Sequence, residues 1–482
     1  MRVAFLSASG EVGGAERVLL DLAASLRRAE PRWELHLVTA AEGPLAAAAA
    51  ELGGRVHVRP FPAALARVGD AGGSAGGSRA GLFPSLLAAA PGGARWTAGL
   101  RRLLRSIAPD VVHSHGFKVH VLGALALPRG ARLVWHVHDY VSARRVMAGA
   151  MRRVAGRASA ALAVSESVAA DVRAACGPGL RVTTVRNAID LARFAPDGER
   201  LRLDELASMP PAPPGTVRVG LVATMGVWKG HEVFLRAIAA LDRDLPVRAY
   251  VVGGAIYGTA GSEVSVDGLR RLASELGIGD RVGFTGFGDA AAAMRALDVV
   301  VHASTQPEPF GLVIAEAMAC ARPVVVSAAG GAAEIVHEGR DALGFPPGDV
   351  RAMAEAIRRL VVDPDLRARM GAAGRETAER DFDRARLAAE VAPVYRSLVG
   401  DGSDVGGDVG SADVGSDDNG SSSRSDHGSH VRSISRSDDG SHVGSGSRSH
   451  VGSGDGSDGG SGDVGSGSGG SGDGADGGSD AG

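Results

Sequence analysis

Short runs of valine, leucine and isoleucine alternate with longer alanine- and arginine-rich stretches along the first 400 residues. Apolar runs of strand length joined by helical stretches are typical of parallel sheets covered on both faces. In the first half we predict strands at residues 3–9, 34–39, 55–59, 111–114, 133–138, 161–165 and 182–186. In the second half we predict strands at residues 217–223, 248–252, 282–285, 299–303 and 324–327. The sequence therefore predicts an α/β protein with two facing, Rossmann-like, doubly wound domains that bind ligands between them.

The boundary between these domains is indicated by a proline-rich patch at residues 209–215 (MPPAPPG). We expect the hinge within residues 190–215, and we assign residues 1–193 to the first domain and the following residues to the second. Residues 401–482 are nearly all Gly, Ser and Asp, with no aromatic side chain. Such a segment cannot bury enough apolar surface to offset its ordering entropy, so we predict that it is disordered.

The formal net charge is only −3, but arginines are concentrated in the first half. The most concentrated are Arg101, Arg102, Arg105, Arg144, Arg145, Arg152, Arg153 and Arg157. Two interpretations stay open: a solvated basic face, or attraction to a membrane surface or an anionic acceptor. Nucleic acid is not an expected partner, because the chain has few aromatic residues and no recognisable nucleic-acid motif.

The compartment is indicated by cysteine usage and by the N-terminus. Only Cys176 and Cys320 are present, far apart in sequence, which favours a reducing compartment over a disulfide. The first ten residues lack the pattern of a signal peptide, and no apolar run reaches membrane-spanning length. We expect a cytoplasmic protein, at most peripheral at the inner face of the cell membrane.

The most informative local segment is EPFGLVIAE, in which Glu308 and Glu316 lie eight positions apart. One continuous helix would separate these carboxylates by about 12 Å along its axis and about 80° around it. The prolines and glycine around Glu308 exclude that helix, so Glu308 lies in a loop and Glu316 lies about one turn into a helix. The free amides at the start of that helix, near Gly311, favour an anion. This arrangement suits a ligand with hydroxyls at both ends and phosphates between them.

Two further loops follow predicted strands and could approach the same ligand. Gly13 and Gly14 follow the first strand and precede a helix, although their spacing is not that of a nicotinamide-binding motif. Lys229 lies in a loop after the strand at 217–223, where its ammonium suits a phosphate. The alternatives are an ordinary tight turn for the glycines and an exposed surface side chain for the lysine.

Histidines occur in alternate positions at the ends of two strands of the first half. His113 and His115 share one strand face, as do His136 and His138. His115 and His138 are expected on the cleft side in a hydrogen-bonding role, while His113 and His136 are expected to be buried structural residues. A zinc site is the alternative, but nothing in the sequence requires ligands to converge there, and we predict no metal.

These segments together resemble the retaining glycosyltransferases of family four, also described as glycosyl transferases group 1, which have the GT-B fold. The resemblance covers essentially residues 1–400. The matching segments are 13–16 (GGAE), 138–139 (HD), 187–190 (NAID), 308–316, 322–324 (RPV) and 330–331 (GG). Phe382 and the helix through Tyr395 resemble the closing segment of that family. By this resemblance residues 194–383 are the donor-binding domain, and residues 384–400 form a helix that returns to the first, acceptor-binding domain.

The resemblance implies a transferase that moves a sugar from a nucleotide-diphosphate sugar, UDP or GDP by default, to a glycan, lipid-linked or small-molecule acceptor. It suggests a role in cell-envelope polysaccharide synthesis, with no cofactor. Glu308, Lys229 and His138 are the implied catalytic residues. The implied donor-binding residues are Gly13, Gly14, Thr224, Phe310, Gly311, Leu312 and Glu316. On the acceptor side we expect Glu16 and His115.

Two residues depart from the family pattern, the first with a consequence for phosphate binding and the second for local backbone geometry only. Thr224 stands where family members commonly carry an arginine as a second phosphate cation, and Ala188 replaces the usual glycine. Two alternative functions stay open, and only the second of them is suggested by the missing arginine at Thr224. One is an epimerase or hydrolase of nucleotide sugars on the same fold, and the other is a catalytically silent protein that only binds a nucleotide sugar.

Overall fold

The fold is described by a computed structural model, which places residues 1–67, 79–254 and 263–400, with side chains outside 79–89. The predicted disordered tail at 401–482 lies outside these residues. The described residues belong to one compact unit. Among them, no helix combines the length and the apolar character that crossing a membrane requires.

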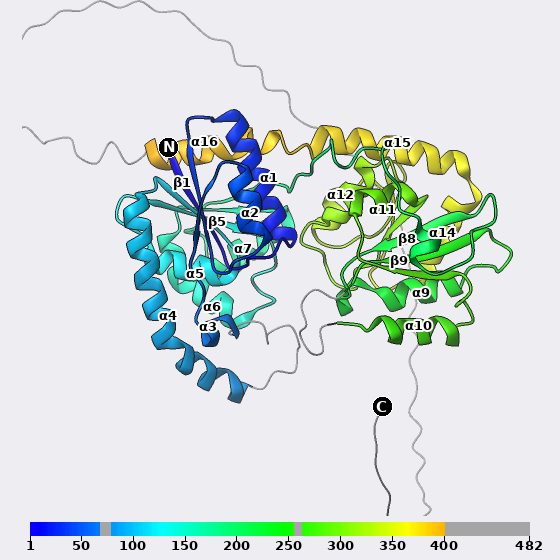
Figure 1. Ribbon diagram of the computed structural model, residues 1–482, viewed down its shortest axis with the longest axis horizontal. Coiled ribbons are helices and arrows are strands. Elements are labelled where there is room, and N and C mark those ends of the chain that lie inside the picture. Colours follow the sequence, from blue (N-terminus) through cyan, green and yellow to red (C-terminus); the bar gives the residue numbers. More distant parts are fainter. Residues whose placement is uncertain (68–78, 255–262, 401–482) are drawn as a thin grey trace, which may run out of the picture. The chain divides into compact units, whose positions relative to one another are not determined.

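The first half contains a seven-stranded parallel sheet in the order β3-β2-β1-β4-β5-β6-β7 (Figure 1). Its strands are β1 (Arg2–Ser7), β2 (Glu34–Thr39), β3 (Arg55–Val58), β4 (Val111–His115), β5 (Arg132–Val137), β6 (Ala160–Ala163) and β7 (Val182–Thr184). The strand order reverses between β1 and β4, so the connections from these two strands leave in opposite directions and open a crevice at their carboxyl ends.

Alternate residues of these strands pack on opposite faces because side chains in a strand alternate in direction. Val3 and Phe5 of β1 belong to one core with α1 (Gly14–Ala29) and α16 (Arg386–Gly400). Ala4 and Leu6 belong to a second core with α4 (Arg79–Ile107) and α5 (Phe117–Ala126). The helices of this half are α1 (Gly14–Ala29), α2 (Pro44–Glu51), α3 (Ala63–Arg67), α4 (Arg79–Ile107), α5 (Phe117–Ala126), α6 (Arg145–Val154) and α7 (Glu166–Cys176), and a short 3-10 helix, η2 (Ala155–Arg157), follows α6.

The second half contains a six-stranded parallel sheet in the order β10-β9-β8-β11-β12-β13. Its strands are β8 (Val217–Val222), β9 (Val247–Val252), β10 (Val282–Gly286), β11 (Val299–His302), β12 (Val324–Ser327) and β13 (Ala342–Phe345). The order reverses between β8 and β11. The connections after these two strands carry Lys229 and Glu308, so both residues lie beside the crevice.

Helices cover both faces of this second sheet as well. One core joins α9, α10 and α14 to the sheet, and another joins α11 and α12. The helices are α8 (Leu203–Leu206), the 3-10 helix η3 (Val227–Lys229), α9 (His231–Ala239), α10 (Val266–Glu275), α11 (Ala290–Ala296), α12 (Leu312–Ala319), α13 (Gly331–Glu334), α14 (Val350–Val362), α15 (Pro364–Asp381) and α16 (Arg386–Gly400).

The last helix, α16, packs on the first half. Leu387, Val391 and Tyr395 are buried in the same core as Val3 and Phe5 of β1. Figure 1 shows α16 (orange) beside α1 (blue), although the two are separated by most of the sequence. The chain therefore returns to its first domain after completing the second.

The structure corrects the predicted strands at one point and adjusts several of their ends. The sequence prediction omitted β13, which pairs with β12 through Val324 and Ala342. Its residues, Ala-Leu-Gly-Phe, include no β-branched side chain, and a glycine within a strand weakens the pattern. The first strand ends at Ser7 rather than residue 9, because Ser9 lies in the turn that leads to α1.

Candidate functional site

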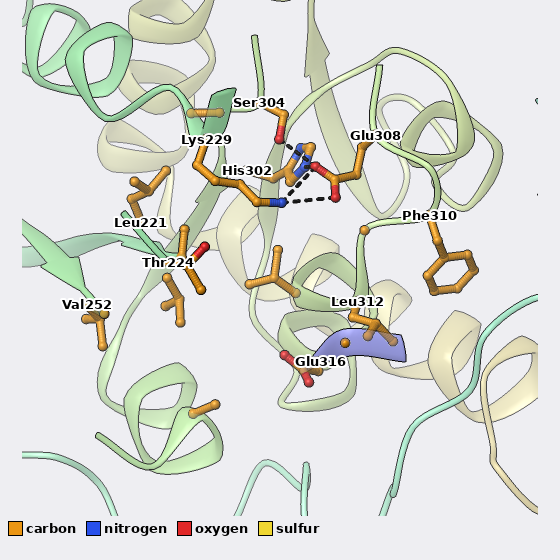
Figure 2. Close-up of a pocket in the computed structure, with 18 of the residues that line it drawn as sticks. Leu221, Thr224, Lys229, Val252, His302, Ser304, Glu308, Phe310, Leu312 and Glu316 are labelled. Atoms are coloured by element: carbon orange, nitrogen blue, oxygen red, sulfur yellow. Dashed lines mark hydrogen bonds and ion pairs between the residues drawn. The ribbon is translucent and has the colours of Figure 1, made fainter. Parts of the chain in front are cut away.

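The main pocket lies at the carboxyl ends of the strands where both sheets reverse their order. It has a volume of about 410 Å³. Figure 2 shows its second-half side, where Lys229, Glu308 and Glu316 point into the space. Its polar lining includes Gly14, His138, Asn187, Thr224, Lys229, His302, Ser304, Glu308, Gly311 and Glu316. Its apolar lining includes Leu221, Val252, Phe287, Phe310 and Leu312. A pocket of mixed lining with a few convergent charged groups is typical of a small-molecule site.

Glu308 is the centre of the polar network in this pocket (Figure 2). The Lys229 ammonium lies 3.0 Å from both carboxylate oxygens of Glu308. Ser304 Oγ donates to Glu308 Oε2 at 2.6 Å, and His302 Nε2 lies 3.3 Å from the same oxygen. The Lys229 side chain is 23% exposed and that of Glu308 16%, so this ion pair is largely withdrawn from solvent but still reachable from the pocket.

Lys229 is positioned by a tight turn between η3 and α9. Gly230 follows it in the left-handed region with φ of 74°. A Cβ atom at Gly230 would lie 1.9 Å from the carbonyl oxygen of Ala303, which follows β11. Glycine is therefore required here both for its backbone conformation and for the close approach of the two chain segments. This approach brings the lysine next to the loop that carries Glu308.

The two glutamates of the predicted motif have opposite charge environments. Burial alone would raise the pKa of Glu308, but the Lys229 ammonium and the hydrogen bonds from His302 and Ser304 hold that pKa well below its usual range. Burial raises the pKa of Glu316 to about 7, against the opposing influence of Arg17 and Arg193. Glu308 is thus ionised at neutral pH, whereas Glu316 gains or loses its proton near neutral pH.

Helix α12 begins between the two glutamates and directs its N-terminus at the pocket. Gly311 is its N-cap, with φ of 96°, and no side chain caps the helix. Leu312 Cδ1 lies 3.7 Å from the position that a Cβ atom of Gly14, the first residue of α1, would take. Two helix N-termini therefore lie close together, and their free amides and partial positive charges suit an anionic group.

A cluster of four histidines lies beneath the first-half side of the pocket. The ring nitrogens of His113, His115 and His136 lie within 4.8 Å of one another and could hold a metal ion. All three side chains are buried, and burial keeps their pKa values well below the usual range, so the imidazoles are neutral. His138 lines the pocket above them, and its Nε2 lies 2.9 Å from His115 Nδ1.

Three histidines are a donor set that zinc accepts when a water fills the fourth position. Nitrogens around tetrahedral zinc lie about 3.3 Å apart, so the rings would have to move closer together. No carboxylate is among the described ligating groups of the cluster, so its protein ligands would be three histidines. The second nitrogen of His113 is bound to the Tyr395 hydroxyl of α16, which indicates a structural contact between β4 and the last helix.

The structure brings most of the predicted site residues together. Of those predicted, Gly14, His138, Thr224, Lys229, Glu308, Phe310, Gly311, Leu312 and Glu316 line the pocket. Gly13, Glu16 and His115 are not among its lining residues. Gly13 is the N-cap of α1, Glu16 lies next to Ser7, whose hydroxyl donates to it at 3.4 Å, and His115 is buried behind His138.

His302 and Ser304 are among the pocket residues that sequence reasoning did not find. Both stand at the carboxyl end of β11, immediately before the loop of Glu308. Their position after a buried strand was the available signal, because polar residues at that edge of a parallel sheet face the crevice. Lys229 is the one lysine or arginine that lines the pocket among the residues that the structure describes, and Thr224 lines it without a charge.

Two family profiles match the chain, one for each half. Residues 12–193 match the family described as Glycosyltransferase Family 4. Residues 210–377 match the family described as Glycosyl transferases group 1. The junction between the two matches falls within the expected hinge region at 190–215.

Relatives of known name and solved structures agree with these profiles. D-inositol 3-phosphate glycosyltransferase of Salinispora tropica is 31% identical over 81% of this chain and 82% of its own length. GDP-mannose-dependent alpha-(1-6)-phosphatidylinositol monomannoside mannosyltransferase of Mycolicibacterium smegmatis is 32% identical over 54% of this chain and 68% of its own. The crystal structure of Anabaena HepE in complex with UDP and glucose is similar with a TM-score of 0.66 and 26% identity, over 82% of this chain and all of that one. The chain therefore belongs to glycosyltransferase family 4, and its two Rossmann-like domains form the GT-B fold of those glycosyltransferases.

Proposed function

We propose that this protein transfers a sugar from a nucleotide-diphosphate sugar to an acceptor hydroxyl with retention of configuration and without a metal ion. The observation that carries the proposal is the pocket in which Lys229, the N-terminus of α12 and the carboxylates of Glu308 and Glu316 converge. A cation and free amides suit a diphosphate, and carboxylates on either side suit the hydroxyls of two sugars.

Each residue then has a distinct role. Glu316 accepts hydrogen bonds from the ribose hydroxyls of the donor, and Glu308 accepts from hydroxyls of the sugar that is transferred. Lys229 and the amides at the start of α12 bind the diphosphate. His138, neutral because burial lowers its pKa to about 3, contacts the donor sugar as a hydrogen-bonding group and does not act as a cation.

The reaction needs stabilisation of charge more than it needs a protein nucleophile. As the bond between the anomeric carbon and the β-phosphate oxygen breaks, negative charge grows on the diphosphate, and Lys229 and the helix N-termini are already in place to stabilise it. The acceptor oxygen attacks the same face, and its proton passes to the leaving phosphate oxygen. Because these groups supply the positive charge, the proposal includes no metal and no cofactor.

The acceptor is proposed to be anionic or lipid-linked. The names of two relatives include an inositol phosphate and a phosphatidylinositol mannoside, and both are phosphorylated. In the first half, α6 exposes Arg145, Arg152 and Arg153, together with the apolar side chain of Val146 at 53% exposure. A basic helix face with an exposed apolar residue favours contact with an anionic surface, so peripheral attachment to a membrane is part of the proposal. UDP and GDP sugars are the proposed donors.

The proposal is tested by incubating the purified full chain with a panel of UDP and GDP sugars, with and without inositol phosphate or phosphatidylinositol acceptors. Product analysis should show a glycosylated acceptor whose anomeric configuration matches the donor. Lys229→Ala and Glu316→Ala should each lower the transfer rate at least about tenfold, the loss of one charge-assisted contact. Lys118→Ala, which changes a lysine of α5 outside the pocket, is the matched control.

Three results would contradict the proposal. Wild-type rates in both pocket variants would remove the pocket from the reaction. Consumption of the donor that does not depend on any acceptor would indicate a hydrolase or an epimerase. Binding of nucleotide without turnover would indicate a silent binding protein.

A further inference from the structure

The three donors that hold the Glu308 carboxylate differ in how freely they can move. Ser304 and His302 are 1% and 3% exposed, and both are partners of Glu308 Oε2. Lys229 is more exposed, reaches the carboxylate by a long flexible stem, and is the partner of Oε1 as well. Two short, buried donors and one mobile cation therefore share a single carboxylate.

The two buried donors are themselves held in place. Ser327, at the end of β12, donates its hydroxyl to the Ser304 carbonyl oxygen at 2.6 Å, which fixes the backbone that carries the Ser304 side chain. His302 ends β11, and its Nε2 must carry the proton because a carboxylate oxygen can only accept. Its Nδ1 has no hydrogen-bond partner within the part of the chain that the structure describes. His302 thus makes one polar side-chain contact there, and that contact is with Glu308.

We propose that His302 and Ser304 are positioning residues that hold the Glu308 carboxylate in place when Lys229 leaves it for the diphosphate of the donor. The inference rests on the proposed function, since it assigns a diphosphate as the competitor for Lys229. Glu308 and the diphosphate are both anions, and one ammonium cannot fully neutralise both. The Lys229 ammonium therefore moves from the Glu308 carboxylate to the diphosphate of the ligand. The two buried donors keep the carboxylate oriented toward the sugar.

The pKa of Glu316 indicates how the pKa of Glu308 would change without such donors. Glu316 lies in the same pocket, where burial outweighs the opposing influence of Arg17 and Arg193 and raises its pKa to about 7. Glu308 would move in the same direction if it lost Lys229 and had no other donor, and it would then be protonated in part of the molecules at neutral pH. His302 and Ser304 prevent this and keep Glu308 an acceptor for sugar hydroxyls.

The first arm of the test measures binding of UDP and GDP, which lack the sugar, by calorimetry. Glu308→Gln removes the competitor for Lys229, so the affinity for the nucleotide that binds should rise about tenfold, the scale of one charge-assisted contact. In a Lys229→Met background the same Glu308→Gln change relieves only the repulsion between the carboxylate and the phosphates, so the gain in affinity should be smaller. Equal gains in nucleotide affinity in both backgrounds, or no gain in either, would contradict the movement of Lys229 from Glu308 to the nucleotide.

The second arm measures transfer kinetics in variants of the two donors. Ser304→Ala and His302→Leu should each lower kcat about 10- to 100-fold, the loss of a hydrogen bond to a charged group, with donor KM within about threefold of wild type. Ser304→Thr and His302→Gln keep a donor at the same place and should recover most of the lost rate. In the unrecovered variants the acid limb of the pH profile should move up toward neutral pH. Ser106→Ala, an exposed hydroxyl on α4, is the control.

The outcomes separate the inference from the proposed function. If wild-type protein transfers sugar and Ser304→Thr and His302→Gln are as impaired as Ser304→Ala and His302→Leu, the two residues are packing elements and the inference is wrong. Loss of nucleotide affinity in proportion to kcat would have the same meaning. If wild-type protein transfers no sugar from any donor, the proposed function fails, while the binding arm still decides whether Lys229 is shared.

Discussion

Replacing Glu316 by glutamine should make the protein more stable than wild type at high pH. This difference in unfolding free energy should become smaller as the pH falls. The pKa of Glu316 is raised from its usual 4.5 to about 7 by burial. The native state therefore holds this proton more tightly than the unfolded chain does. Between these two values the unfolded chain binds fewer protons, so the stability of wild type falls as the pH rises.

The magnitude follows from the difference between the two pKa values. At about 1.36 kcal/mol for each pH unit, burying the ionised Glu316 costs at most about 3.4 kcal/mol when the carboxyl is fully deprotonated. About 2 kcal/mol of this cost develops between about pH 5.5 and about pH 8.5. Glutamine has nearly the same shape and no charge, so its stability does not carry this dependence.

The assay is urea unfolding of the full chain without nucleotide, at about pH 5.5 and about pH 8.5, for wild type and Glu316→Gln. We expect the difference in unfolding free energy between the two proteins to change by about 2 kcal/mol in favour of the variant at the higher pH. Glu275→Gln, at an exposed position on α10, is the control and should show no such change. A constant difference across the pH range would mean that Glu316 is solvated or paired, and the reasoning on its burial would be wrong.

Two further predictions concern the turn that carries Lys229 and the C-terminal segment. Gly230→Ala should lower the unfolding free energy by about 2 kcal/mol or more, from a left-handed alanine and a clash with the Ala303 carbonyl. Gly339→Ala is the control, because it has the same backbone strain, with φ of 75°, but open space at the Cβ position. The difference between the two variants in thermal unfolding therefore measures the clash at Gly230. Equal losses of stability in the two variants would contradict the clash. Deleting residues 401–482 should leave transfer activity intact, because every described pocket residue precedes residue 400. A large loss of rate would show that the segment takes part in the reaction.

Most of the architecture was accessible from the sequence because parallel strands are buried on both faces. Such strands have uninterrupted apolar sequences, as in β11 and β12. The ends of these two strands were predicted within one or two residues. The edge strand β13 was missed because it is short, pairs on one side only and contains Gly344. Its identity as a strand depends on the neighbouring β12, and no local pattern carries that information.

The site was predictable where a local constraint fixes the backbone. Pro307, Pro309 and Gly311 forced a loop before α12, and the structure places Glu308 in that loop and Glu316 in the helix. His302 and Ser304 were not predictable in the same way, because their role depends on how the turn at Gly230 brings Lys229 against β11. Likewise, nothing local indicated that His115 lies behind His138, since its burial depends on the packing of β4 between β1 and β5.

The presence of one cation, Lys229, among the described lining residues, with Thr224 lining the pocket uncharged, connects these observations. With one ammonium among the described lining residues, a diphosphate can gain a side-chain cation only by taking Lys229 from Glu308. A pocket with two cations could leave one of them on the carboxylate, and the two buried donors would then matter little. Here the carboxylate must be kept charged and oriented by other means, and Ser304 and His302 are the groups within reach. On this reasoning Thr224→Arg should tighten nucleotide binding and reduce the kinetic effect of Ser304→Ala, because the new cation could bind the phosphates while Lys229 stays on Glu308. An unchanged effect of Ser304→Ala in the Thr224→Arg background would show that the orientation of Glu308 does not depend on competition for Lys229.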